Sequence, residues 1–280
     1  GDNVVTRADE FPSNQYPWLN LAHRGVEVRR LPVGPDGSLD LQRLADACDA
    51  RTRIVSLSWV AYANGWRHDL DELAEVVHER GALLFIDGIQ GLGVFPLDVR
   101  RTPIDFLAAD GHKWMLGPEG AALFYCRREH LDLLRPLGVG WNSVVHEHDF
   151  TRIEPVWKAS AARYEGGSAN CAGQIALAAS LELLASFGFE ATAARVLEFT
   201  DLACERLSAV GAQILSNREG RHRSGIVTFV LPGADHQQIR QHCLERGVVL
   251  SCRGGGLRIS PHAYNDESDL DRLIEAIETV

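Results

Sequence analysis

The sequence lacks three features that would place the protein in a specialised class. It has no basic block: 28 Lys and Arg against 38 Asp and Glu give a net charge of −10, spread along the chain. Its longest apolar runs, such as 82–86, have the length of a strand, whereas a membrane-spanning helix needs about 20 residues. The six cysteines never form a Cys-x-x-Cys pair. These absences disfavour nucleic-acid and membrane partners and a disulfide framework, and they favour a soluble protein of the reducing cytoplasm.

The composition is otherwise that of an ordinary globular protein. Of the 280 residues, 45% are hydrophobic and 24% are charged, which is enough for one large core or two smaller ones. The sequence shows neither an internal repeat nor a low-complexity tract. It opens at Gly1 with no initiator Met and no signal segment, so we expect a fragment of a longer protein.

Short β-branched runs alternate with amphipathic stretches up to about residue 126. This alternation predicts a mostly parallel sheet covered by helices, two of which begin at the capping residues Asp40 and Asp69. The link between residues 108 and 121 is too short for a helical crossover, so we expect the last strand to run antiparallel. The predicted strands span residues 3–6, 26–31, 53–58, 82–86, 104–108 and 121–126.

The second half of the chain predicts a smaller α+β unit that follows a loop region over 138–157. We expect an α/β protein with a large domain over 1–165, and a linking helix with a small domain over 166–280. The predicted elements of the second half are helices at 171–187, 190–210 and 236–246, strands at 226–231 and 248–251, and a last helix from Asp266.

Polar side chains follow three predicted strands at their carboxyl ends. Tyr62 follows the third strand, Asp87 the fourth, and Asp110-Gly111-His112-Lys113 the fifth. Ligands of open α/β sheets bind at this edge. A carboxylate, a His and a Lys suit pyridoxal phosphate, which needs a Lys for a Schiff base, an acid for its ring nitrogen and donors for its phosphate. The sequence therefore predicts a pyridoxal phosphate site, with Lys113, Asp87 and His112 in these roles.

Five motifs occur in an order that matches a known family. They are Ser13-Asn14 with Pro17-Trp18, the segment 85–91, the segment 110–114, the segment 166–170, and the segment 257–260 with Tyr264-Asn265. Across essentially the whole chain, the sequence resembles the class V aminotransferase-like enzymes of pyridoxal phosphate fold type I. This group includes cysteine desulfurases, selenocysteine lyases and isopenicillin N epimerases. The resemblance implies a large cofactor-binding domain and a smaller C-terminal domain.

The resemblance also implies roles for residues that hold the cofactor. Lys113 forms the Schiff base, Asp87 pairs with the pyridine nitrogen, and Gln90 bonds the ring hydroxyl oxygen. His112 reaches the phosphate or the ring. Ser168 matches a position that contacts the phosphate of the neighbouring subunit, which implies a homodimer with shared active sites.

Other matched positions face the substrate or depart from the family. Arg258 is expected to clamp the carboxylate of an amino-acid substrate, and Asn14 is expected to bind substrate as well. Tyr62 stands where many desulfurases have Asn, and Asp110 stands where they have Ser. Because a carboxylate repels a phosphate, we expect Asp110 to order His112 or the loop instead. The aromatic ring that stacks on the cofactor in this family is expected in a segment before Gly1.

The expected reaction depends on Cys252, which lies six residues before Arg258. Desulfurases carry a nucleophilic Cys on a loop before the clamping Arg, but here the connection is short and a buried, unreactive Cys is the commoner case. We therefore expect transamination or epimerisation at the α-carbon, with Lys113 as the base. The alternatives are a lyase of the desulfurase or selenocysteine lyase type, and a truncated, non-catalytic relative that serves as a dimeric binding or scaffold protein.

One short motif could bind a metal. His146 and His148 flank Glu147, and alternate residues of a strand share a face. No third ligand follows at a useful spacing, so we predict a solvated loop and no metal.

Overall fold

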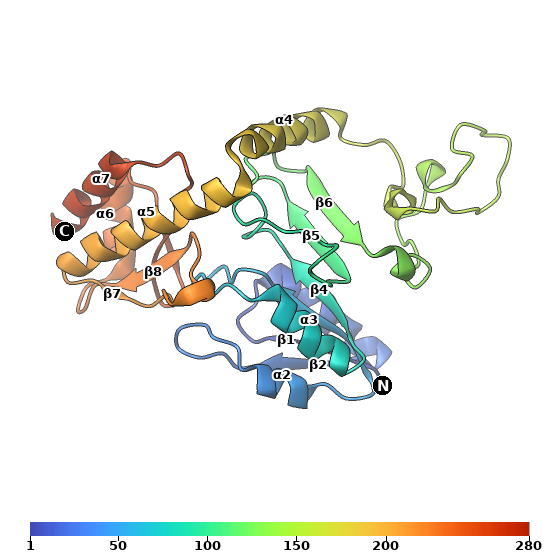
Figure 1. Cartoon of the computed structure of the whole chain (residues 1–280), viewed down its shortest axis with the longest axis horizontal. Coiled ribbons are helices and arrows are strands. Elements are labelled where there is room, and N and C mark those ends of the chain that lie inside the picture. Colours follow the sequence, from blue (N-terminus) through green and yellow to red (C-terminus); the bar gives the residue numbers. More distant parts are fainter. Residues whose placement is uncertain (280) are drawn as a thin grey trace.

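The computed structural model describes residues 1–279, which form two sheets (Figure 1). The larger sheet has the strand order β2-β1-β3-β4-β5-β6. All neighbouring strands are parallel except β5 and β6, which are antiparallel, as the short link between them predicts. The strands are β1 (Asn3–Arg7), β2 (Glu27–Leu31), β3 (Thr52–Ser58), β4 (Leu83–Asp87), β5 (Phe106–Asp110) and β6 (Ala122–Cys126).

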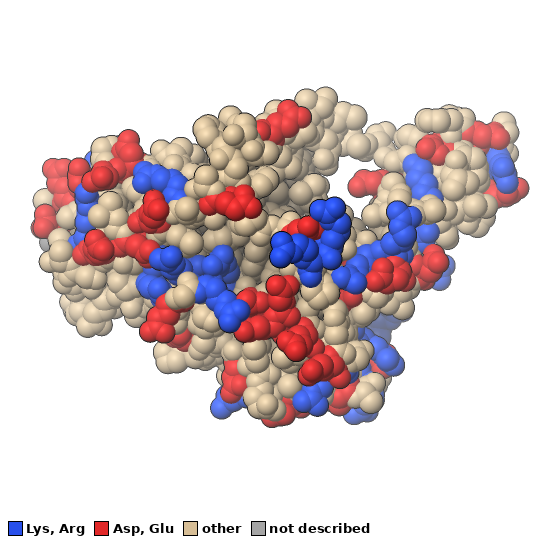
Figure 2. Space-filling view, in the orientation of Figure 1, with Lys and Arg blue, Asp and Glu red and all other residues tan. Residues whose placement is uncertain are grey.

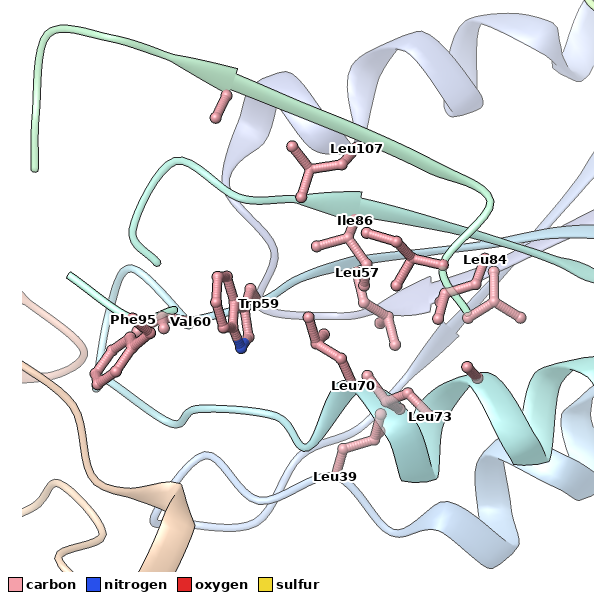
Figure 3. Packing of buried hydrophobic residues seen from close by; sticks show 14 of the residues in the cluster. Leu39, Leu57, Trp59, Val60, Leu70, Leu73, Leu84, Ile86, Phe95 and Leu107 are labelled. Atoms are coloured by element: carbon pink, nitrogen blue, oxygen red, sulfur yellow. The ribbon is translucent and has the colours of Figure 1, made fainter. Parts of the chain in front are cut away.

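Helices α2 (Leu41–Ala47) and α3 (Leu70–Glu79) pack beside each other on this sheet. The carboxylates of Asp40 and Asp69 accept backbone N–H bonds at their first turns, which confirms both predicted caps. Leucines of α3 face the fully buried side chains of the central strands in Figure 3. Short helical turns fill the connections, namely η1 (Pro12–Asn14), α1 (Tyr16–Leu19), η2 (Asn20–Arg24), η3 (Arg128–His130), η4 (Trp141–Ser143) and η5 (Ala161–Tyr164).

The smaller sheet lies in the C-terminal part, with strand order β7-β8-β10-β9 and all pairs antiparallel. Its helices surround a second core that includes Phe199, Phe229 and Leu257. No single helix within residues 1–279 is long and apolar enough to cross a membrane, and α4 with α5 reaches that length only as a pair bent by 80°. The elements are α4 (Cys171–Phe187), α5 (Phe189–Ala209), β7 (Gln213–Ile214), η6 (Gly220–His222), β8 (Val227–Val230), α6 (His236–Glu245), β9 (Ser251–Arg253), β10 (Gly256–Ile259) and α7 (Glu267–Glu278).

The predicted strand at 248–251 is wrong in position. Strand β9 begins at Ser251 and pairs with β10, which the pattern of the sequence does not reveal as a separate strand. The reason is the turn between them, where Gly254 and Gly255 have φ of +60° and +81° and reverse the chain within two residues. The predicted domain boundary after residue 165 stays a prediction, because α5 contributes to both cores.

We expect Gly93→Ala to lower the free energy of unfolding by about 2–4 kcal/mol, from backbone strain together with overpacking. Gly93 has φ of +92°, and a Cβ there would lie 2.4 Å from the carbonyl oxygen of Trp114. Gly81 has φ of +73°, and no atom lies within 4 Å of the position that a Cβ would take, so Gly81→Ala should lose only about 1 kcal/mol. Urea denaturation measures both losses. Equal losses would contradict the close approach of residue 93 to the loop of Lys113.

Candidate active site

The parallel strands β1, β3, β4 and β5 end at one edge of the large sheet, and a cavity of about 410 Å³ opens there. Four of the residues expected at the site line this cavity together: Tyr62, Gln90, Lys113 and Arg258. The other lining residues are Phe11, Trp114, Leu116, Arg253, Ser260, His262 and Tyr264. Tyr62, Gln90 and Lys113 come from the loops after β3, β4 and β5, and Arg258 comes from β10. The cavity is therefore lined by both halves of the chain.

Lys113 follows the end of β5 and is half-buried. Its Nζ lies 5.9 Å from the centroid of the Phe11 ring. Burial lowers the pKa of the Lys113 amine, while the nearby Asp87 carboxylate acts in the opposite direction. The loop continues through Leu116, a non-glycine residue with φ of +57°, whose N–H donates to the Lys113 carbonyl oxygen at 3.0 Å. The turn therefore holds a lysine that loses its proton more easily than a lysine in water does.

Asp87 ends β4, and both of its carboxylate oxygens are bonded. The backbone N–H of Ile89 donates to Oδ1 at 2.9 Å, and Asn14 Nδ2 donates to Oδ2 at 2.6 Å. Asn14 was expected on the substrate side, but the structure places its amide against the carboxylate expected to hold the pyridine nitrogen. This contact orients the Asp87 carboxylate from the side of the first strand.

Gln90 and Trp114 form the buried floor of the cavity. Trp114 Nε1 donates to Gln90 Oε1 at 2.7 Å. His262 stacks on the Trp114 ring with centroids 5.5 Å apart, and its Nε2 donates to the Trp114 carbonyl oxygen at 2.9 Å. Burial lowers the pKa of His262, consistent with a neutral ring that donates through Nε2.

Asp110 and His112 lie side by side before Lys113. Asp110 Oδ1 and His112 Nδ1 are 3.1 Å apart, and the expectation that Asp110 orders His112 stays a prediction. These two buried atoms lack hydrogen-bond alignment with any partner among residues 1–279, and so does Arg258 Nε. Buried polar atoms without partners at a ligand-binding edge fit a polar ligand that completes their bonds. With a half-buried lysine and a carboxylate beside them, these groups fit pyridoxal phosphate.

Arg258 belongs to a set of bonds between the two halves of the chain. Its Nη1 donates to the Tyr62 carbonyl oxygen at 2.6 Å, and burial lowers the pKa of its guanidinium. The next three carbonyl groups, of residues 63, 64 and 65, accept bonds from the hydroxyl groups of Thr228, Ser216 and Ser224 at 2.6, 2.5 and 2.7 Å. Arg258 is thereby held above the cavity that Lys113 lines.

Five of the expected site residues are not among those that line this cavity, namely Asn14, Asp87, Asp110, His112 and Ser168. Ser168 is exposed and lies two residues before Asn170, the N-cap of α4, and it does not line the cavity. His146 lies with Glu147 in the irregular segment 138–157, where both line a separate cavity. Within residues 1–279, no group of three or more His, Cys, Asp or Glu side chains could hold a metal ion.

Phe11 was not expected at the site. Its ring lies 5.2 Å from the Tyr62 ring in an edge-to-face arrangement and lines the cavity beside Lys113. An aromatic ring inside the chain therefore stands next to the lysine, and the ring expected before Gly1 stays a prediction. Phe11 follows the end of β1 by four residues, so the argument from strand ends that selected Tyr62 and Asp87 would have found it.

Comparison with known proteins extends over nearly the whole chain. The family model for aminotransferase class-V matches residues 1–273. A probable cysteine desulfurase of Methanothermobacter thermautotrophicus is 30% identical, and the alignment covers 100% of this chain and 73% of the relative. The cysteine desulfurase CsdA of Escherichia coli K12 is also 30% identical over 99% of this chain and 71% of its own length.

Solved structures share the fold. The crystal structure of Escherichia coli CsdA aligns with a TM-score of 0.88 at 26% identity, over 100% of this chain and 72% of that chain. The cystine C–S lyase C-DES, in complex with its reaction product cysteine persulfide, aligns with a TM-score of 0.91 at 24% identity, over 99% of this chain and 75% of that chain. The expected family resemblance and fold type are confirmed: the chain belongs to the aminotransferase class-V family.

Proposed function

We propose that this protein is a pyridoxal phosphate-dependent lyase that cleaves the carbon–sulfur bond of cysteine or of a closely related sulfur amino acid. The observation that carries the proposal is the single cavity in which Lys113, Gln90 and Arg258 meet. Its curated relatives are named as cysteine desulfurases. The expected transamination or epimerisation has no support in these comparisons, and the lyase alternative fits them better. The scaffold alternative does not account for the assembled cavity.

The residues that line the cavity, with Asp87 beside them at the end of β4, would divide the work of such a reaction. Bound pyridoxal phosphate supplies an electron sink that weakens bonds at the α-carbon and β-carbon of the substrate. Lys113 removes the α-proton and can give it to the departing sulfur, a role for which its lowered pKa suits it. Asp87 holds a proton at the ring nitrogen, and Gln90 bonds the ring hydroxyl oxygen. Arg258 binds the substrate carboxylate through two parallel N–H groups.

Aromatic rings form two walls of the cavity. The rings of Phe11 and Tyr62 pack edge to face on one side. Trp114, stacked on His262, closes another side. In this arrangement Phe11 would lie beside bound pyridoxal phosphate, next to Lys113.

The position of Cys252 bears on the fate of the sulfur. Its Sγ donates to the His236 carbonyl oxygen at 3.4 Å, toward α6. Arg253, the next residue of β9, lines the cavity, and neighbouring side chains of a strand point to opposite faces, so Cys252 faces away from it. With no thiol at this position to accept it, the sulfur of cysteine would leave as sulfide by elimination, at an unchanged oxidation state, and the three-carbon remainder would leave as an unsaturated amine. The cystine C–S lyase C-DES, of the same fold, acts on a substrate that already has an S–S bond and has cysteine persulfide as its reaction product.

We also propose that two copies of the chain assemble into a homodimer. Helix α4 contains one charged residue, Glu182, and exposes Ile175, Leu183 and Phe187 by 71%, 53% and 69%. The surface over α4 is largely uncharged in Figure 2. The neighbouring segment 138–157 extends away from both sheets in Figure 1 and exposes further apolar side chains. Apolar surface of this extent is typical of an interface, and a second copy would bring Ser168 toward the partner's cofactor.

The first test concerns Lys113, because the sequence contains only one other lysine, Lys158. Borohydride reduction of the protein with bound pyridoxal phosphate should label the Lys113 peptide alone. Lys113→Ala should lower the rate of sulfur release from cysteine by about 10³-fold or more. Lys158→Ala is the matched control, since Lys158 pairs with Glu147 at 3.3 Å outside the cavity. A labelled Lys158 peptide would overturn the site.

The second test concerns Cys252. Cys252→Ala should leave sulfur release within about twofold of the wild-type rate, because the thiol faces away from the cavity. Mass spectrometry after incubation with cysteine should find no added sulfur on the Cys252 peptide. A gain of one sulfur there, lost together with activity in the variant, would instead make the protein a persulfide-forming desulfurase.

The third test concerns the assembly. Sedimentation should find the wild-type protein as a dimer and Ile175→Glu as a monomer with weaker cofactor binding, because a charge on the apolar face of α4 opposes association. Val249→Glu, at a position 82% exposed outside α4, should remain dimeric. A fully active wild-type monomer would refute the shared site.

A further inference from the structure

We propose that Glu10 is a positioning residue for Asp87 and acts on it through Ser58 and Asn14. The inference rests on the proposed function, in which the Asp87 carboxylate holds the proton of the cofactor's ring nitrogen. Glu10 itself is not among the residues that line the cavity. Its influence on the reaction therefore has to pass through side chains that lie between it and Asp87.

Glu10 is a buried carboxylate, 4% exposed, in the loop that follows β1. Both of its oxygens face one residue. The Ser58 backbone N–H donates to Oε1 at 2.8 Å, and the Ser58 hydroxyl donates to Oε2 at 2.6 Å. A buried carboxylate is costly for a fold, and burial raises the pKa of Glu10. Its only side-chain hydrogen bonds within residues 1–279 are directed at the last residue of β3.

Ser58 is in turn the neighbour of Asp87. The two residues are paired in the parallel register of β3 and β4 at the edge of the sheet. Asn14 Nδ2 bridges them, because it donates to Asp87 Oδ2 at 2.6 Å and approaches Ser58 Oγ at 3.4 Å. A continuous series of contacts thus runs from Glu10 through Ser58 and Asn14 to Asp87, and three strand ends contribute to it.

The direction of each hydrogen bond in this series follows from Glu10. The Glu10 oxygens accept both Ser58 bonds, so the Ser58 hydroxyl turns its proton toward Glu10 and presents a lone pair to Asn14. The Asn14 amide then has to place its NH₂ group, and not its carbonyl oxygen, against Ser58 and Asp87. The NH₂ group donates to the Asp87 carboxylate, whereas the carbonyl oxygen would repel it. Glu10 therefore sets the orientation that holds the Asp87 carboxylate in place.

Glu10→Gln tests this reasoning with almost no change in volume. A Gln side chain can accept the Ser58 N–H bond only if its own NH₂ group faces the Ser58 hydroxyl. That hydroxyl then turns its proton toward Asn14, which reverses the direction of the series. We expect the pH midpoint of the visible absorption of bound pyridoxal phosphate to move by about 0.5 unit or more. We expect the rate of sulfur release to fall about tenfold.

The deciding measurement is the ¹⁵N chemical shift of the ring nitrogen of labelled pyridoxal phosphate bound to the protein. In Glu10→Gln it should move toward the value of the unprotonated ring. Ser58→Ala, which removes the middle hydroxyl and keeps Glu10 and Asn14, should move it in the same direction, and it decides the matter if Glu10→Gln does not fold. A loss of stability with an unmoved ¹⁵N shift in the folded variants would overturn the proposal.

Asp105→Asn is the matched control. Asp105 is a carboxylate of the same sheet, 3% exposed, whose oxygens accept bonds from the Leu84 N–H, His78 and His130 at the opposite end of β5. It should lose stability and leave the ¹⁵N shift unchanged. An equal shift in Asp105→Asn would also overturn the proposal. A wild-type protein that binds no pyridoxal phosphate would refute the proposed function, whereas binding with unmoved variants would refute only the role of Glu10.

Discussion

Four consecutive carbonyl groups hold the two halves of this protein together at its active site. The carbonyl oxygens of residues 62–65, just beyond β3, accept side-chain bonds from residues that belong to the C-terminal half. The chain passes so close at Gly65, which has φ of +79°, that a Cβ would lie 2.4 Å from the Ile226 carbonyl oxygen. Without this contact, Arg258 would have no fixed position above Lys113, and the cavity would lose one of its walls.

The edge of the large sheet contributes the rest of the site. Parallel strands bring Asp87, Lys113 and the loop after β1 together although they are far apart in the sequence. The protein as a whole has a net charge of −10, yet Lys113, Arg253 and Arg258 all line the cavity. This local excess of positive charge favours a phosphorylated cofactor and a carboxylate-bearing substrate. The negative charges of the phosphate and of the substrate carboxylate complement the positive charges of these three side chains.

In the proposed reaction the protein does not store sulfur as a persulfide on Cys252. The structural reason is the short hairpin that β9 and β10 form. A sulfur acceptor must approach the substrate and then transfer its sulfur onward, which requires a mobile segment. The glycine turn instead pairs Cys252 with Leu257 in the sheet. The hairpin carries Arg253 at its turn and Arg258 on its second strand, and both line the cavity. In the proposed reaction, substrate binding and sulfur release would take place in that one cavity.

Local patterns in the sequence were enough for the alternating strands and helices, the two Asp caps, the antiparallel last strand and the strand ends that carry Tyr62, Asp87 and Lys113. Each depends on neighbours within a few residues, so the sequence by itself determined them. The β9–β10 pairing, the place of Asn14 against Asp87, Phe11 as a wall of the cavity and the route from Glu10 to Asp87 were decided only by the tertiary structure. The last three join residues separated by tens of positions in the chain, and their hydrogen-bond directions depend on burial, which no local pattern encodes. The β9–β10 pairing is local, but it depends on the positive φ of Gly254 and Gly255, which a run of three glycines does not fix by itself.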